Sequence, residues 1–237
     1  RGRLGLVLRL IGYFLLVFVA LSVLRQLPFV GAIFDVPFLG FYLAAVVVSA
    51  VSARMGSKLI DKRRLKRSIS ALGEVDTPHN AGKLGALLAG QEKHSEALPH
   101  LEKAWAYESD VAEWAYRVGR SKLKLGQIEG AVEALSKAVL LDEEHGYGEA
   151  LRRLAEAKTL AGAPDEALSK LDRHDVTYGE TPESAYLRGR AHQGRGDRAA
   201  AKAAFAKAPS LVEGVVKYQQ AGARSWAMRA RLAGWLA

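Results

Sequence analysis

Side chains able to do acid–base or metal chemistry are present in this chain, but they are scattered. Its six histidines show neither the HExxH spacing of a zinc protease nor a grouping with carboxylates at metal-ligand spacing. They stand at His79, His94, His100, His145, His174 and His192. No phosphate loop of the form GxxxxGKS or GxxxxGKT occurs, and no GxSxG elbow. We therefore predict no catalytic residue, no metal site and no cofactor, and we do not expect an enzyme.

The remaining local clusters have structural explanations. The glycine-rich run 194–197 falls in a turn between two predicted helices. Carboxylate pairs such as Glu143-Glu144 and Asp165-Glu166 fall in turns or first helical turns, where they complement the helix dipole. The chain has no cysteine, which excludes disulfides, cysteine-rich zinc sites and a thiol nucleophile.

Charge is concentrated in the N-terminal segment. Residues 1–70 contain eleven Arg and Lys but two Asp and Glu, whereas residues 71–237 contain 23 of each sign. The net charge of +9 and the pI near 9.7 therefore describe the first segment only. Total charge is thus no argument for a nucleic-acid partner, and we expect none.

A repeated pattern identifies the elements that must position any functional side chain. An alanine followed four residues later by a large apolar residue occurs four times, and the alanines lie 34, 36 and 34 residues apart. The pairs are Ala97/Leu101, Ala131/Leu135, Ala167/Leu171 and Ala201/Phe205. A fixed period of this size is typical of a stacked repeat architecture and favours partner binding over catalysis.

Glycines recur in phase with these pairs. Counted from repeat starts at 78, 112, 148 and 182, the eighth position is Gly in three copies, where a first helix must be small for its partner to approach. Gly126, Gly162 and Gly196 stand in the turn between the two helices of a repeat, because glycine suits the left-handed conformation that ends many helices. Another small position recurs as Ala104, Ala138 and Ala208, with His174 as the exception.

This pattern resembles the tetratricopeptide repeat (TPR), a 34-residue helix–turn–helix unit with L-G followed by A-x3-F. The resemblance covers residues 78–213 and implies an all-α solenoid of about four repeats. The closing proline of the family pattern is missing, since Ser109, Glu143 and Glu213 stand near its position. Repeat three has two extra residues, which we place in the turn 142–148.

The resemblance also implies where partners bind, because the first helix of each TPR unit lines a concave surface. Tyr and Arg, which are enriched at binding hot spots, fall at its inner positions. The predicted partner-binding groove consists of Tyr116, Arg120, Lys124, Arg152, Tyr186 and Arg190. Its charge favours partner proteins with acidic segments. The alternative is a solvated helix face with ordinary ion pairs, such as Arg152 with Glu156.

Residues 1–56 are predicted to form a transmembrane helical hairpin. Residues 4–24 are apolar except for Arg9, and residues 36–53 carry no charge, against the roughly 20 apolar residues that a spanning helix needs. Pro28, Gly31 and Pro37 mark the connecting turn. A cleaved signal peptide is the main alternative for the first run, but it is long for one and a second apolar run follows it. A buried soluble hairpin is the alternative for the pair.

Basic residues flank both apolar runs, whereas the connecting loop holds Arg25 alone. This distribution predicts that both termini and the repeats face the cytoplasm. The layout loosely resembles that of bacterial inner-membrane TPR proteins, which implies an inner-membrane location. The juxtamembrane linker, residues 57–77, holds the predicted lipid-headgroup residues Lys58, Lys62, Arg63, Arg64, Lys66 and Arg67. These residues are either a lipid contact or only a topology signal.

Residues 214–237 are predicted to form a terminal helix. Solenoids need an element that covers the apolar face of the last repeat, which favours a capping helix. Trp226, Trp235 and four basic residues make a partner-docking or membrane-interface helix the alternative.

Three functions follow from this organisation. The first is a membrane-anchored adaptor or scaffold that recruits partner proteins at the cytoplasmic face. The second is a structural or assembly subunit of a larger membrane complex, in which the hairpin packs against other transmembrane helices through small residues. The third is an enzyme of unrecognised type.

Overall fold

The computed structural model describes residues 67–74 and 77–236, together with seven helical positions, Gly12, Leu15, Leu16, Phe18, Val19, Ser22 and Val23. The chain divides into two compact units, residues 1–70 and 71–237. Apart from those seven positions, the predicted hairpin of residues 1–56 lies outside the described residues, as do residues 57–66 and 75–76 of the predicted linker. In the described parts, no helix is long and apolar enough to cross a membrane.

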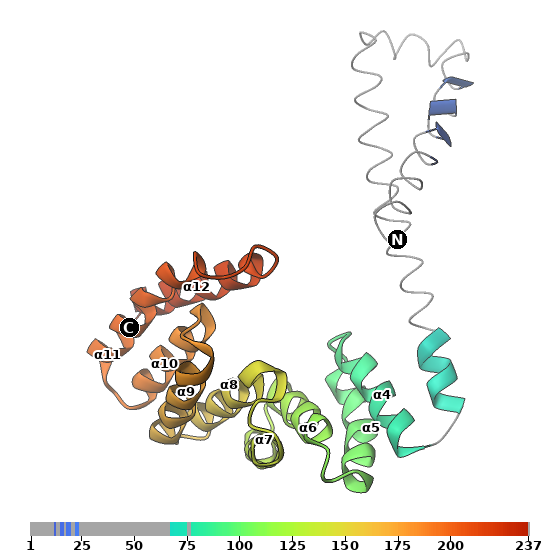
Figure 1. The fold of residues 1–237 in the computed structure, drawn as a ribbon, viewed down its shortest axis with the longest axis horizontal. Coiled ribbons are helices and arrows are strands. Elements are labelled where there is room, and N and C mark those ends of the chain that lie inside the picture. Colours follow the sequence, from blue (N-terminus) through green and yellow to red (C-terminus); the bar gives the residue numbers. More distant parts are fainter. Residues whose placement is uncertain are drawn as a thin grey trace. The chain divides into compact units, whose positions relative to one another are not determined.

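The second unit consists of consecutive helix pairs and a terminal helix (Figure 1). The pairs are α4 (Pro78–Ala89) with α5 (His94–Tyr107), α6 (Ala112–Lys124) with α7 (Ile128–Leu141), α8 (His145–Leu160) with α9 (Pro164–Tyr178), and α10 (Pro182–Gly194) with α11 (Arg198–Lys207). The short 3₁₀ helix η1 (Ser210–Val212) precedes α12 (Gln220–Leu236). The described residues contain no strand, so the all-α prediction is confirmed for them.

Local sequence explains where α4 and α10 begin. The Thr77 hydroxyl accepts a hydrogen bond from the backbone N–H of Asn80, and Pro78 takes the first helical position. Thr181 and Ser184 form a capping box at the start of α10, where Pro182 is again first. Prolines are favoured there because the first N–H of a helix has no partner within the helix.

The turn within each repeat uses one left-handed residue at the same position. The predicted turn glycines Gly126, Gly162 and Gly196 have φ between +75° and +79°, as expected. In the first repeat this position is Glu92, which adopts φ of +62°. The backbone geometry of the turn is therefore common to all four repeats.

The small and large residues of the repeat meet directly between the paired helices. A Cβ added to Gly119 would lie 2.6 Å from the Leu135 side chain, and one added to Gly189 would lie 2.4 Å from Phe205. The recurring alanines and large residues on the second helices are almost fully buried. The prediction that the first helix must be small for its partner to approach is confirmed.

Repeat three departs from its neighbours at the start of α8. Gly146, Tyr147 and Gly148 all have positive φ, so the first turn of α8 is a left-handed kink before the regular helix. The two extra residues lie in the predicted 142–148 turn. A Cβ on Gly148 would collide with His174 and Tyr178, so this glycine leaves space for the fully buried His174 ring that replaces alanine here.

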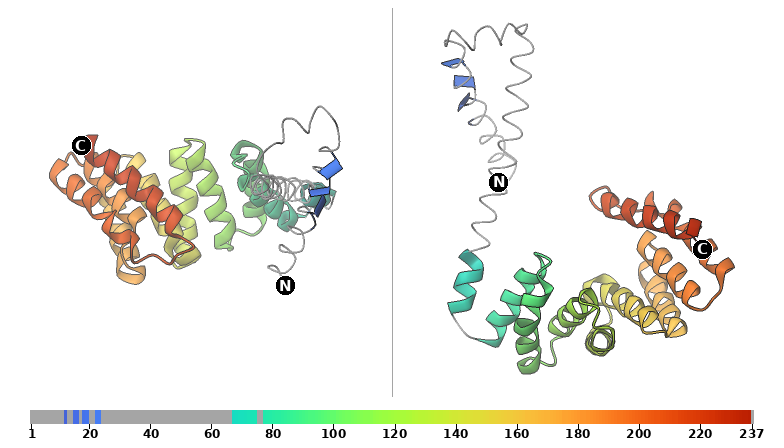
Figure 2. Two further views of the ribbon diagram at one scale, coloured as in Figure 1. Left: turned by 90° about the horizontal axis from the view of Figure 1, so that it is seen from above. Right: turned by 180° about the vertical axis from the view of Figure 1, so that it is seen from behind.

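The repeats stack so that the first helices α4, α6, α8 and α10 contact one another more closely than the second helices do. They therefore form the inner face of the unit. The last helix, α12, packs on both α10 and α11 (Figures 1 and 2). Its Ala230 joins the core cluster of Ala185, Ala201 and Phe205. The helix begins at Gln220, six residues later than predicted, and its packing on α10 and α11 is compatible with the predicted capping role.

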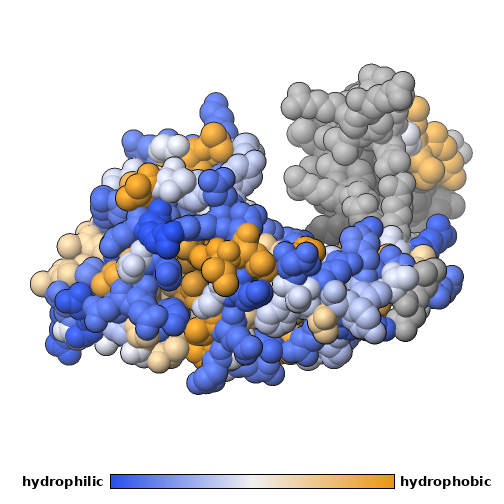
Figure 3. All heavy atoms as spheres, turned by 60° about the horizontal axis from the view of Figure 1, so that its bottom comes forward, coloured by the Kyte–Doolittle hydropathy of each residue, from blue (hydrophilic) through white to orange (hydrophobic). Residues whose placement is uncertain are grey.

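The core of the unit is a series of small clusters rather than one interior. Each cluster joins residues of neighbouring helices along the stack. The view in Figure 3 accordingly shows a mostly hydrophilic surface over the repeats, interrupted by small apolar patches. Side chains that contact the neighbouring repeat therefore stabilise the stack and also shape the surface that a partner would contact.

Candidate protein-binding face

The inner face between α8 and α10 has a small cavity of about 60 Å³. Its apolar part comes from Leu160, Tyr186 and Leu187, and Glu156 and Arg190 are charged members of its lining. The Arg190 guanidinium donates a hydrogen bond of 3.3 Å to the Tyr186 hydroxyl. An apolar strip formed by Leu160, Tyr186 and Leu187 therefore lies beside exposed Arg190, and Tyr186 and Arg190 are two of the predicted groove residues.

Two further predicted cations lie on α6. Lys124 is exposed, and Arg120 is half-buried. The ion pairs of the described residues involve neither of them, nor Arg190. These three side chains consequently retain donors for an external carboxylate.

Tyr116 does not belong to the exposed surface. It is 6% exposed and packs in a core cluster with Leu135 and Leu154. Its ring centroid lies 5.0 Å from that of His145. Burial raises the pKa of the Tyr116 hydroxyl well above its usual range, and the nearby Glu149 carboxylate adds to this effect. The prediction that it stands exposed in the groove is corrected, because stacking of α8 onto α6 covers the ring.

Arg152 also differs from its predicted role. Its side chain is 17% exposed, its Nε lies 3.4 Å from Oε2 of Glu183, and its Nη1 lies 3.1 Å from Nε2 of His174. The predicted pair with Glu156 does not form, since Glu156 is paired with Arg153. The guanidinium of Arg152 therefore pairs with a carboxylate of the next repeat and is not free for a partner.

Arg153 completes this inter-repeat cluster. It pairs with Glu183 on α10 as well as with Glu156 on its own helix. Burial opposes the charge on Arg153, but the Glu183 and Glu156 carboxylates outweigh it and raise the pKa of the guanidinium. The Arg153–Glu183 pair is largely shielded from solvent and joins α8 to α10, so removing one partner should destabilise this contact.

Residues of α12 extend the inner face, although none of them belongs to the predicted groove. The Trp226 ring lies 5.4 Å from Tyr186, and the Arg229 guanidinium lies 4.5 Å from the Trp226 ring centroid. A cavity of about 450 Å³ is lined by residues of α8, α10 and the start of α12, including Arg152, Glu183 and Trp226. Trp226 is the residue in the sequence that could have indicated this contribution of α12. Its contact with Tyr186, however, depends on the angle at which α12 crosses α10, which the sequence pattern does not give.

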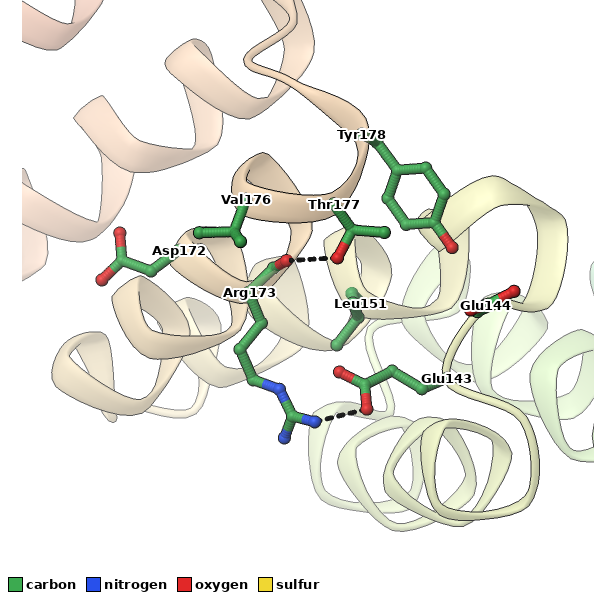
Figure 4. A pocket seen from close by; sticks show the side chains of 8 residues that line it. All are labelled: Glu143, Glu144, Leu151, Asp172, Arg173, Val176, Thr177 and Tyr178. Carbon is green, nitrogen blue, oxygen red and sulfur yellow. Dashed lines mark hydrogen bonds and ion pairs between the residues drawn. The ribbon is translucent and has the colours of Figure 1, made fainter.

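A third cavity, of about 480 Å³, lies between α9 and the α7–α8 turn (Figure 4). Arg173 reaches across it to Glu143, and the Thr177 hydroxyl donates a hydrogen bond of 3.3 Å to the Arg173 carbonyl. The apolar lining comes from Leu151, Val176 and Tyr178. None of the predicted groove residues takes part in it.

The other predicted sites fall largely outside the described residues. Of the lipid-headgroup residues, Arg67 alone is described, and it is exposed. Among the described residues, no group of three His, Cys, Asp or Glu side chains is placed to hold a metal ion.

Comparison with known proteins supports the repeat assignment. Residues 88–145 match the sequence model of the tetratricopeptide repeat. No curated protein sequence matches the chain.

Several solved structures share the fold. A crystal structure of MamA protein is similar with a TM-score of 0.58 and 22% identity, covering 69% of this chain and 91% of that one. YrrB, described as a TPR protein with an unusual peptide-binding site, has the same TM-score and identity, covering 71% of this chain and 88% of its own. The thermophilic TPR protein TTC0263 of Thermus thermophilus has a TM-score of 0.52 and 17% identity, covering 76% and 96%. The described helices thus form a TPR solenoid.

Proposed function

We propose that this chain is an adaptor that binds an extended segment of another protein along the first helices of its repeats. The observation that carries the proposal is the apolar strip of Leu160, Tyr186 and Leu187 beside Arg190. Exposed Arg190 and Lys124 and half-buried Arg120 add donors that form no ion pair with a carboxylate of the described residues. A strip of this kind suits a partner segment that combines an apolar side chain with acidic residues.

The similarity to YrrB supports the same mode, because the description of that protein names a peptide-binding site. Charge-assisted hydrogen bonds to Arg would fix the orientation of the segment, and the exposed Leu160 beside Tyr186 would provide the apolar contact. Acidic segments are thus the partner chemistry that we propose, with no cofactor and no reaction.

We further propose that the adaptor is tethered to a membrane, with both termini and the repeats in the cytoplasm, as in a bacterial inner membrane. Support comes from the two apolar runs and from the basic residues on their flanks. Leu15, Val19 and Val23 also recur every four residues at helical positions, and their side chains are exposed. An apolar helix face of this kind is stable in lipid or against another transmembrane helix.

Peptide binding to residues 71–237 tests the groove. An array of extended peptides should select acidic members that contain a large apolar residue. The double variant Arg120→Glu and Arg190→Glu should weaken their binding at least tenfold, since each replacement turns an attraction into a repulsion. Lys202→Glu is the matched control, because Lys202 is exposed on the second helix α11. It should bind as the unmodified fragment does.

Binding that survives in the double variant would remove the groove from the proposal. If partner recovery from membranes then depended on residues 1–56 alone, the chain would be a structural subunit of a membrane complex. Unfolding curves should show that the variants remain folded, because substitutions at exposed positions usually change the free energy of unfolding by only about 0.5 kcal/mol.

A further inference from the structure

Helix α12 has two faces, and the fold uses one of them. Ala223, Ala227 and Ala230 are buried against the last repeat, and Gly234 allows close approach to Phe205. Small residues on this side let α12 lie close to α10 and α11. Besides these small residues, Trp226 contributes to the cap through its contact with Tyr186, so the capping role does not use Met228, Leu232 or Trp235.

Those larger residues lie on the opposite face. Met228, Leu232 and Trp235 follow one another at spacings of four and three residues, which places them on one side of a helix. Their side chains are 65%, 60% and 86% exposed, and the adjacent Leu236 is 79% exposed. A continuous exposed apolar stripe, unlike a single exposed residue, marks an interaction surface.

The charges around this stripe are all positive. Arg224 and Arg231 border it on one side and Arg229 on the other, as helical periodicity places them. Residues 214–237 contain four basic and no acidic residues, whereas residues 71–213 contain 19 basic and 23 acidic residues. The ion pairs of the described residues include none of these three arginines. Their charge is therefore available to an external anion.

An apolar stripe with arginines along both edges and a tryptophan at its end matches the surface of an anionic membrane both in charge and in apolar character. Anionic lipid headgroups attract the arginines, and the boundary with the acyl chains accepts Leu, Met and Trp side chains. We propose that the outer face of α12, formed by Met228, Leu232 and Trp235 with Arg224, Arg229 and Arg231, binds an anionic membrane surface. Apart from Arg229, which also lies over the Trp226 ring, this site is separate from the inner face of the repeats, and it does not depend on residues 1–56.

Vesicle sedimentation tests the proposal with residues 71–237, a compact unit whose core clusters all lie within it. The fragment should bind vesicles of phosphatidylcholine with phosphatidylserine much more strongly than vesicles of phosphatidylcholine alone, and added salt should weaken binding. Arg224→Gln with Arg231→Gln should lower partitioning by about fivefold per arginine. Trp235→Ser should lower it further, because the ring supplies apolar contact.

Tyr107→Ser is the matched control, since Tyr107 is 75% exposed on α5, away from α12. It should leave vesicle binding unchanged, and Trp235→Ser should leave peptide binding by the inner face unchanged. Equal binding of the Trp235→Ser fragment, or no preference for anionic vesicles, would overturn the proposal. So would a dimer in light scattering that dissociates on Trp235→Ser without any vesicle binding, because the stripe would then face a second copy.

Discussion

At the scale of single residues, contacts between a small residue and a large one hold each repeat together. Gly189 faces Phe205 as Gly119 faces Leu135, and the alternating sizes let the paired helices approach. In the third repeat, Ala155 and Leu171 meet in one buried cluster, so a methyl group is tolerated there. The eighth position of a repeat therefore accepts Gly or Ala, depending on the size and conformation of the side chain that faces it on the second helix.

Gly189→Ala tests this packing. The added methyl group would lie 2.4 Å from Cε1 of Phe205, and overpacking of this kind costs about 1–3 kcal/mol. Gly222→Ala is the matched control, because a Cβ there meets nothing within 4 Å. The control should be neutral or stabilising by up to about 1 kcal/mol, as expected for alanine in a helix. Urea unfolding of residues 71–237 measures both, and equal midpoints would contradict the packing account.

At the scale of elements, polar contacts between helices set how repeats three and four stack. Arg188 on α10 bonds Asp175 on α9 at 2.8 Å, and Nδ1 of the buried His174 lies 2.8 Å from the same carboxylate. Burial acts against the charge on Asp175, but the hydrogen bonds from His174 and Arg188 outweigh it and lower the pKa. The charged carboxylate therefore stabilises the junction between the two repeats.

This lowered pKa gives a pH dependence of definite sign. Since the folded-state pKa lies below the unfolded value near 4, the stabilisation is present above that value and is lost as pH falls through the folded pKa. Asp175→Asn should therefore destabilise residues 71–237 by about 1–3 kcal/mol at pH 7, and the difference should shrink toward pH 3. Asp172→Asn, at a more exposed partner of Arg188, should have a smaller effect. A pH-independent difference would contradict this account.

The sequence period predicted the helices and turns of each repeat well, because the contacts inside a repeat join residues that are close in sequence. Gly126, Gly162 and Gly196 have the expected left-handed conformation, and the large residues are buried as predicted. The groove was harder to predict. Tyr116 is covered by the next repeat, and Arg152 binds Glu183 in the repeat that follows its own. Such contacts depend on how repeats stack, which the phase of one helix does not determine.

At the scale of the whole molecule, two kinds of surface coexist in one compact unit. The inner face offers an apolar strip with cations to a partner segment, and the outer face of α12 offers an apolar stripe between arginines. The N-terminal segment holds the whole net positive charge of the chain. If the chain is tethered to a membrane as proposed, its repeat domain, which has no net charge, would bind partner proteins near the membrane surface.

Reporter fusions test the proposed topology. A reporter joined after residue 70 should show a cytoplasmic signal, and one within residues 26–35 should show an external signal, because basic residues flank both apolar runs and the loop has Arg25 alone. Replacing Lys62, Arg63, Arg64, Lys66 and Arg67 with Gln should weaken this orientation. An external signal at residue 70 in the unmodified chain would contradict the proposed arrangement.

Photo-crosslinking from the inner face is the most direct test of partner binding by the groove. A photoreactive amino acid at Leu160 lies in the apolar strip, whereas the same residue at Leu140 is exposed on the second helix α7. With the full chain in its native cells, we expect a discrete protein adduct from position 160 that disappears in the Arg120→Glu, Arg190→Glu variant, and no such adduct from position 140. An adduct from position 140 alone, or one from position 160 that persists in the double variant, would contradict it.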